Sequence, residues 1–231
     1  MVIKMNKLEI KGLDEYLYHK VLNNGLDVYL YKANYTNEYR VSFFTKYGST
    51  HNDFKIDGSK EYKNYPLGIA HFLEHKLFES ETKEAPFEFF SKSGTDSNAC
   101  TSFFQTCYYI EGSNNYKDNL NFLIDFVQEP YFTDKNVEKE KGIIEQELHM
   151  YNDNPNYILF YRTLYNLMHK HSIKYDIGGS VESINKVTKD MLYECYNTFY
   201  SPNNMTIVVT GNIDIDETLN IIESNQNNKN I

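Results

Sequence analysis

The sequence predicts an α+β domain in which helices cover one face of a sheet. Two early segments alternate polar and apolar residues, as half-buried strands do, and an apolar strand returns near the end of the chain. Amphipathic helices lie between them. The predicted strands are 27–33, 39–47, 98–111 and 205–210. Strands separated by groups of helices favour a sheet with helices packed on one side.

The first helix is expected to follow a polar loop over residues 49–65. It should begin at Pro66 and run to about Glu79, because proline is favoured at a helix start. A short helix over 85–92 should then end at Gly94.

The segment 98–111 is predicted to be one long strand. Cys100 and Cys107 lie an odd number of residues apart within it, so their side chains would point to opposite faces. Apolar residues recur at helical spacing in most of the remaining chain. The predicted helices there are 116–128, 134–152, 156–170, 188–199 and one that starts within 214–222.

Composition limits the class of protein. The 231 residues carry a formal net charge of −9, which argues against nucleic-acid binding. No apolar stretch approaches the length of a membrane span, and the first residues contain no apolar segment typical of a secretory signal. The three cysteines show no disulfide spacing, so we expect reduced thiols and a cytoplasmic location.

The strongest chemical signal is the motif His71-Phe72-Leu73-Glu74-His75. It has the order H-x-x-E-H, which is the order of H-E-x-x-H reversed. On a helix these three polar residues share one face. Two imidazoles four residues apart can bind one zinc ion, and a carboxylate beside them can activate water. The motif therefore predicts a metal site with its own general base.

A zinc site needs a third protein ligand, and the predicted helix over 134–152 offers candidates. Glu140 and Glu147 lie two helical turns apart and so share a face, whereas Glu145 lies on another. The residues alone leave open an ordinary charged helix surface. The expected ligand set of nitrogen and oxygen atoms would also accept manganese or cobalt.

The sequence resembles the insulinase/pitrilysin-type zinc metallopeptidases, a family that includes mitochondrial processing peptidase. The H-x-x-E-H motif and an E-x6-E pair about seventy residues later carry the resemblance, and Glu147 follows His75 by 72 residues. Further similar segments extend over almost the whole chain. They are Asn24-Gly25-Leu26-Asp27-Val28, Ser97-Asn98-Ala99-Cys100-Thr101-Ser102, Gly178 to Ile184 and Tyr200 to Met205. In its residues, the sequence is most similar to bacterial two-domain members of this family.

The resemblance implies a mainly antiparallel sheet packed against helices, and a peptidase that cuts peptides or unfolded segments. It implies Zn²⁺ held by His71, His75 and Glu147, with Glu74 taking a proton from the water at the metal. Glu140 would orient a histidine.

The same resemblance implies a substrate site on a sheet edge. Asn98 and Ala99 would lie where a peptide backbone adds as an extra strand.

Bacterial members of the family usually carry two homologous domains. Residues 1–231 are therefore expected to form a single N-terminal zinc-binding domain, and a second homologous domain or a partner subunit is expected outside this chain. Three hypotheses follow: a peptidase domain, a zinc-binding subunit that works only in an assembly, and an inactive remnant. The substrate stays open, because a fold and a motif do not choose one.

Overall fold

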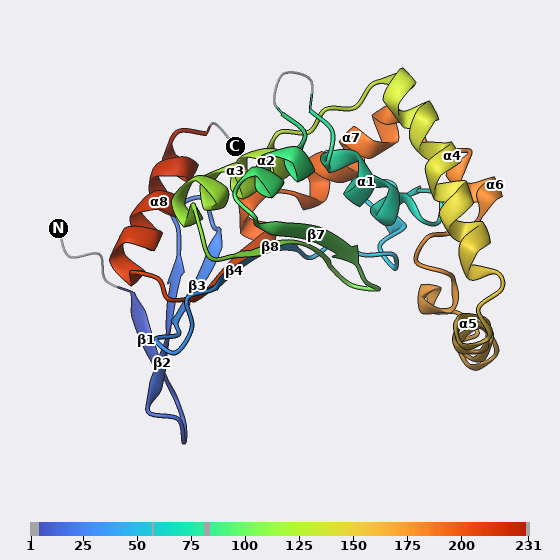
Figure 1. Cartoon of the computed structure of the whole chain (residues 1–231). Helices are drawn as coiled ribbons and strands as arrows, with labels where there is room; N and C mark the ends of the chain where they lie inside the picture. The colour runs from blue at the N-terminus through green and yellow to red at the C-terminus, as the bar shows by residue number, and fades with distance from the viewer. Residues whose placement is uncertain (1–4, 57, 81–83, 230–231) are drawn as a thin grey trace.

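The computed structural model describes residues 5–56, 58–80 and 84–229 and arranges them as a seven-stranded sheet with helices above it (Figure 1). The strands, in their order across the sheet, are β1 (Asn6–Ile10), β2 (Glu15–Val21), β3 (Asp27–Lys32), β9 (Met205–Gly211), β4 (Tyr39–Thr45), β8 (Thr106–Gly112) and β7 (Asp96–Thr101). Only β3 and β9 pair in parallel among these strands. The α+β class with a mainly antiparallel sheet is confirmed.

Apart from the short helix α6, which was not predicted, the helices follow the predicted order. They are α1 (Ile69–Leu77), α2 (Pro86–Lys92), α3 (Tyr116–Gln128), α4 (Asp134–Tyr151), α5 (Pro155–Leu167), α6 (Val181–Ile184), α7 (Lys189–Phe199) and α8 (Ile215–Asn227). Figure 1 shows α1, α2, α3 and α8 over the same face of the sheet, as predicted, and α4 to α6 at one end of it. Within the described ranges, no helix has the length and apolar character needed to span a membrane.

The core lies between the sheet and the helices that cover it. Alternate residues of β3, β4 and β9 are fully buried there, which is the period that a strand imposes on its two faces. These residues are Val28, Leu30, Val41, Phe43, Ile207 and Val209. Burying each such side chain contributes roughly 1.5–3 kcal/mol, so the central strands and the helices stabilise one another.

The prediction of one strand over 98–111 was wrong. β7 and β8 form a hairpin, and the backbone N–H of Ser102 donates to the carbonyl of Gln105 across its turn at 2.8 Å. Cys100 and Cys107 therefore lie directly opposite one another instead of on opposite faces. Phe103 and Phe104 occupy the turn. Glycine, proline or asparagine would be the usual sequence signal of a turn, and none of them is present there.

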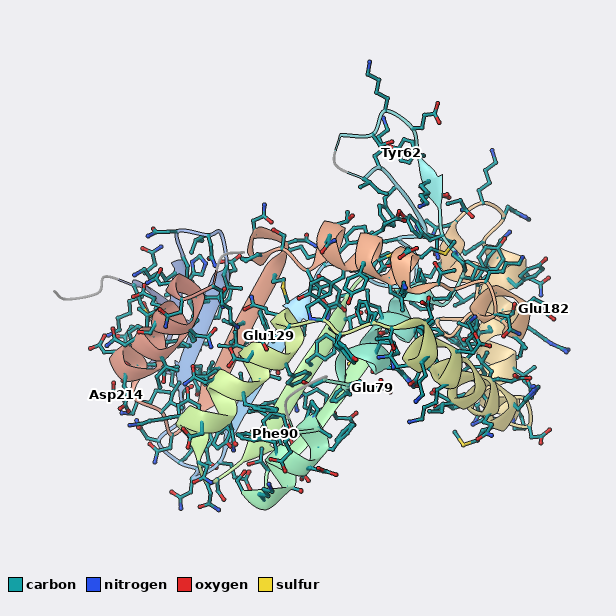
Figure 2. The ribbon with its side chains drawn as sticks, turned by 90° about the horizontal axis from the view of Figure 1, so that it is seen from above. Tyr62, Glu79, Phe90, Glu129, Glu182 and Asp214 are labelled. Atoms are coloured by element: carbon teal, nitrogen blue, oxygen red, sulfur yellow. The ribbon has the colours of Figure 1, made fainter. Side chains whose placement is uncertain are left out.

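Other differences lie at exposed parts of the chain. β1 and β2 were not predicted, because their residues are largely exposed or only half-buried and lack a clear apolar face. The segment expected to be a loop over 49–65 contains a small hairpin of β5 (Asp53–Phe54) and β6 (Lys63–Asn64). Figure 2 shows Tyr62, before β6, projecting from the body of the protein.

Helix α1 begins at Ile69, three residues later than predicted, because Gly68 precedes it in the left-handed conformation with φ of 85°. A Cβ atom at Gly68 would lie 2.3 Å from the carbonyl oxygen of Gly178. Glycine at this position thus allows the start of α1 to pack against a segment from far along the chain.

Gly68→Ala is expected to lower the free energy of unfolding by about 2–5 kcal/mol, through backbone strain and steric overlap. Gly142→Ala is the matched control, since Gly142 lies in α4 with open space around it. The free energy of unfolding of the control should be unchanged or raised by up to about 1 kcal/mol, because alanine favours helices. Urea denaturation of both variants checks this, and equal unfolding free energies would contradict it.

Candidate metal centre

Helix α1 places the apolar and the polar residues of the motif on different faces. Phe72 and Leu73 are fully buried in the core. His71, Glu74 and His75 lie at i, i+3 and i+4, and all three line one cavity outside that core. The helical placement of the motif thus agrees with the prediction.

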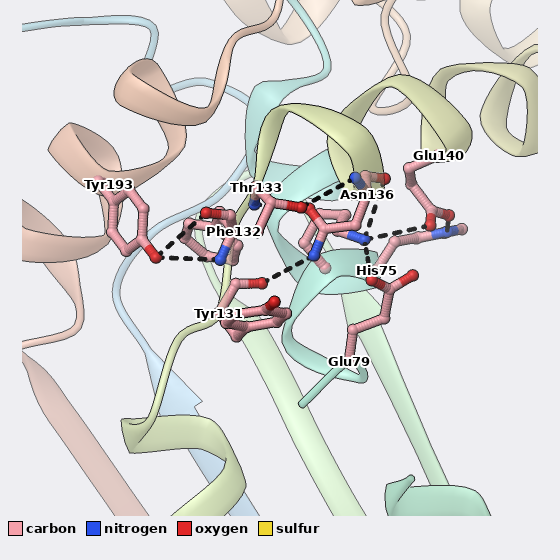
Figure 3. Close-up of polar contacts among 9 residues, drawn as sticks. His75, Glu79, Tyr131, Phe132, Thr133, Asn136, Glu140 and Tyr193 are labelled. Carbon is pink, nitrogen blue, oxygen red and sulfur yellow. Dashed lines mark hydrogen bonds and ion pairs between the residues drawn. The ribbon is translucent and has the colours of Figure 1, made fainter. Parts of the chain in front are cut away.

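Helix α4 supplies the carboxylates. It starts at a capping box in which Thr133 and Asn136 exchange side-chain and backbone hydrogen bonds (Figure 3). Val137 and Ile144, one face of α4, are buried. This anchors the helix beside α1, so that Glu140 and Glu147 both reach the histidines of the motif.

Three of these side chains converge on one point. The Nε2 atoms of His71 and His75 are 3.2 Å apart. An Oε2 atom of Glu147 lies 3.5 Å from Nε2 of His75 and 3.8 Å from Nε2 of His71. One ligand atom from each residue therefore lies within 4.8 Å of the others, an arrangement that can hold a metal ion.

The donor set fits zinc. Two nitrogen ligands at ordinary zinc distances around a tetrahedral ion lie roughly 3.3 Å apart, which the two imidazoles match. The side chains of His71, His75 and Glu147 are 15%, 24% and 28% exposed, so the site stays open on one side. Two imidazoles and one carboxylate with an accessible position are typical of a catalytic zinc site.

Glu140 holds one of the imidazoles in place. Its Oε1 atom is 3.0 Å from Nδ1 of His75, as Figure 3 shows, and its side chain is only 7% exposed. The buried ammonium of Lys76 lies 3.8 Å from the other oxygen of Glu140. With Nδ1–H donated to Glu140, the Nε2 lone pair of His75 points toward the shared site.

The two histidines differ in their electrostatics. Burial, together with the neighbouring His75, lowers the pKa of His71 to about 3, so this imidazole is neutral at ordinary pH. Burial alone would lower the pKa of His75, but the hydrogen bond to Glu140 and the charges of Glu74, Glu140 and Glu147 outweigh it and raise that pKa. Burial would also raise the pKa of Glu140, yet its contacts with His75 and Lys76 lower it.

Glu74 lies apart from this cluster of ligand atoms. Its Oε2 atom accepts a 2.6 Å hydrogen bond from the hydroxyl of Thr101 on β7. Burial raises the pKa of Glu74, and the hydrogen bond from Thr101 opposes that shift. A buried carboxylate with a raised pKa beside a metal site is suited to general base chemistry.

A cavity of about 570 Å³ opens in front of these groups. Asn98 and Ala99 of β7 line it together with His71 and Glu74. β7 is one of the two edge strands of the sheet, and the N–H of Ala99 donates to the side chain of Asn98 at 2.8 Å. The structure thus brings the metal, base and substrate-strand candidates predicted from the sequence to one region, with β7 beside the motif.

Sequence reasoning missed several residues of this region. Thr101 lies in a segment that resembled the family but was given no role, and Lys76 was not singled out, because their roles depend on contacts between elements far apart in the chain. Three tyrosines from α4 and α5 also line the cavity, namely Tyr151, Tyr157 and Tyr161. The sequence placed them in predicted helices and gave them no role at a site.

Comparison with known proteins identifies the family. The family model described as Insulinase (Peptidase family M16) matches residues 55–181, more than half of the chain and the part that holds all three candidate ligands. The chain belongs to this peptidase family. A second model, described as the M16 inactive domain, matches residues 186–230, which include α7, β9 and α8.

Relatives of the M16 family agree in sequence and in structure. The chain is 48% identical to the uncharacterized zinc protease YmfH of Bacillus subtilis over 96% of its own length and 52% of that protein. An M16-like peptidase from Alicyclobacillus acidocaldarius has a solved structure that matches with a TM-score of 0.91 and 41% identity, over 97% of this chain and 52% of that one.

The periplasmic protease PqqL from Escherichia coli matches with a TM-score of 0.76 and 27% identity, over 91% of this chain and 23% of that one. The chain spans about half the length of YmfH and of the Alicyclobacillus peptidase.

Proposed function

We propose that this chain is a zinc-dependent endopeptidase domain that hydrolyses peptide bonds in peptides or unfolded segments. The observation that carries the proposal is the convergence of His71, His75 and Glu147 beside the buried carboxylate of Glu74, within one open cavity. Relatives named as zinc proteases support the same chemistry. Zn²⁺ held by these three residues would act as a Lewis acid and lower the pKa of a coordinated water molecule.

Glu74 is proposed to accept the proton of the attacking water and to pass it to the leaving amine. The hydrogen bond from Thr101 holds Oε2 of Glu74, and Oε1 is the atom proposed to take that proton. Glu140 keeps Nδ1 of His75 protonated and so keeps its Nε2 atom available as a ligand. Each residue thus has one task at one atom.

The peptide is proposed to add to the edge of β7. A sheet edge offers unpaired backbone groups that an extended chain can use. Asn98 and Ala99 lie on that strand and line the same cavity as Glu74. A peptide paired there would pass directly in front of the proposed metal site.

Thr101→Val is expected to lower kcat by about 10–100-fold with little change in KM, since a hydrogen bond to a charged group contributes about 1.5–3 kcal/mol. Valine has nearly the same shape as threonine but carries a methyl group in place of the hydroxyl that donates a hydrogen bond to Glu74. Thr101→Ser keeps that hydroxyl and should restore most of the rate. Steady-state kinetics of the three proteins test this; equal losses in the Val and Ser variants would assign Thr101 a packing role only.

The experiment for the proposed function is hydrolysis of a mixture of quenched fluorescent peptides by the purified chain with zinc. We expect turnover that stops when a chelator removes the metal and returns when Zn²⁺ is added back. Metal content is measured on the same samples. Turnover that persists in fully metal-free protein would overturn the proposal.

A second candidate is a zinc-binding half that acts only together with another domain or subunit. The surface of α5 favours it, because this helix has no buried residue and exposes large apolar side chains. Leu159, Tyr165 and Leu167 are 66%, 60% and 64% exposed. Exposed apolar surface of this kind marks interaction sites. Bound zinc without turnover of any peptide by the chain alone, and turnover once a second domain is supplied, would select this candidate.

A further inference from the structure

Two cysteines face each other on the hairpin that borders the proposed active site. Cys100 of β7 and Cys107 of β8 are direct partners across an antiparallel pair, so their side chains lie on the same face of the sheet. Cα atoms of such partners are about 4.5–5.5 Å apart. That separation falls within the range of about 4.4–6.8 Å that disulfides span.

The two thiols have different surroundings. Cys100 is exposed and lines the cavity that contains His71 and Glu74, whereas Cys107 is buried. The neighbouring thiol of Cys107 lowers the pKa of Cys100 to about 7, and the proximity of Cys100, together with burial, raises the pKa of Cys107. Cys100 therefore has the accessible, more acidic thiol, and Cys107 stands next to it as a second sulfur.

We propose that Cys100 and Cys107 form a redox-active thiol pair that hydrogen peroxide converts into a cross-strand disulfide. The Cys100 thiolate attacks one peroxide oxygen, the O–O bond breaks, and Cys100 becomes a sulfenic acid. The hydroxide that leaves takes up the proton lost by the Cys100 thiol and becomes one water molecule. The Cys107 sulfur then attacks the Cys100 sulfur. The S–S bond forms, the S–O bond breaks, and the hydroxide leaves with the Cys107 proton as a second water molecule.

The electron balance of this reaction is complete. The two cysteines lose two electrons and two protons, and one peroxide molecule takes up both to become two water molecules. A thiol reductant reverses the change. The oxidised form would link β7, the strand to which the peptide is proposed to add, covalently to its neighbour β8. The link would lie next to Asn98 and Ala99.

The test uses the reduced, folded protein treated with hydrogen peroxide, followed by alkylation of the remaining thiols and mass spectrometry. Chymotrypsin cleaves after Phe103 or Phe104, which separates the two cysteines, so a disulfide is seen as a linked pair of peptides. We expect the Cys100–Cys107 linked pair in the wild type and equally in Cys195→Ser. Cys195 is the control because it is fully buried in α7.

The variants define the order of the steps. Cys107→Ser should give no linked peptide, and dimedone should label the sulfenic acid at Cys100. Cys100→Ser should give neither product. Two results in the wild type would overturn the proposal: stable dimedone labelling of Cys100 with Cys107 still reduced, or a disulfide that joins two copies of the chain through Cys100. Neither readout depends on peptide hydrolysis, so failure of the proposed function would leave this test intact.

Discussion

Replacing Glu74 with glutamine is expected to lower kcat for peptide hydrolysis by at least about 10²–10⁴-fold, the usual contribution of a general base. Glutamine keeps the shape of the side chain and can still accept the hydrogen bond from Thr101, but it cannot take a proton from water. The ligand atoms of His71, His75 and Glu147 are untouched. Metal content should therefore stay at the wild-type value while turnover disappears.

The control for this variant is Glu138→Gln, which makes the same change at a side chain that is 75% exposed on α4. Its kinetics should equal those of the wild type. Hydrolysis is measured with the same quenched peptides, and zinc is measured by elemental analysis of dialysed protein. A Glu74→Gln protein that retains wild-type turnover would refute the assignment of Glu74 as the base.

Glu147→Ala is expected to weaken zinc affinity by more than about 100-fold, since changes in residues that merely support ligands already cost about 10–100-fold. The substitution removes the one carboxylate that lies near both Nε2 atoms. Two imidazoles then remain, which is fewer protein ligands than catalytic zinc sites use. Hydrolysis should fall in parallel with zinc content, and a large excess of zinc should restore part of the bound metal.

Substitutions of two other glutamates of α4 serve as controls for this loss of zinc affinity. Glu145→Ala removes a surface carboxylate that lies 3.7 Å from His149, and its zinc affinity should be unchanged. Glu140→Ala should show an intermediate loss of about 10–100-fold, because Glu140 orients His75 without reaching the shared point. Competition with a chromogenic chelator gives all three affinities. If Glu147→Ala binds zinc as tightly as Glu145→Ala, the third ligand lies elsewhere.

The helices were predictable where burial imposes a strong period. The predicted bounds of α3 agree with the structure at both ends, because one face of that helix packs against the sheet and α8. β3, β4 and β9 were found for the same reason, as every second residue enters the core. β1 gave no such pattern, since most of its residues face solvent on both sides. The turn between β7 and β8 was missed because aromatic residues occupy it.

The candidate site was predictable only in part from local pattern. The spacing of His71, Glu74 and His75 places them together by helix geometry alone. Nothing in the spacing of α1 identifies Glu147, whose place beside His75 results from the packing of α4 against α1. The family resemblance supplied that partner. No role was predicted for Thr101 or Lys76, because a strand hydroxyl and a helix lysine are ordinary on a protein surface and only the folded contacts show which groups they bind.

The position of β9 in the sheet has a consequence for synthesis of the protein. β3 and β4 are neighbours in the chain, but β9 lies between them and pairs with both. While the ribosome makes residues before 205, the sheet therefore exists only as two separate groups of strands, each with an unpaired apolar edge. Such edges associate readily with other chains. The nascent chain thus depends on β9 to close the sheet, and a molecule interrupted before Met205 should aggregate although its metal motif is already complete.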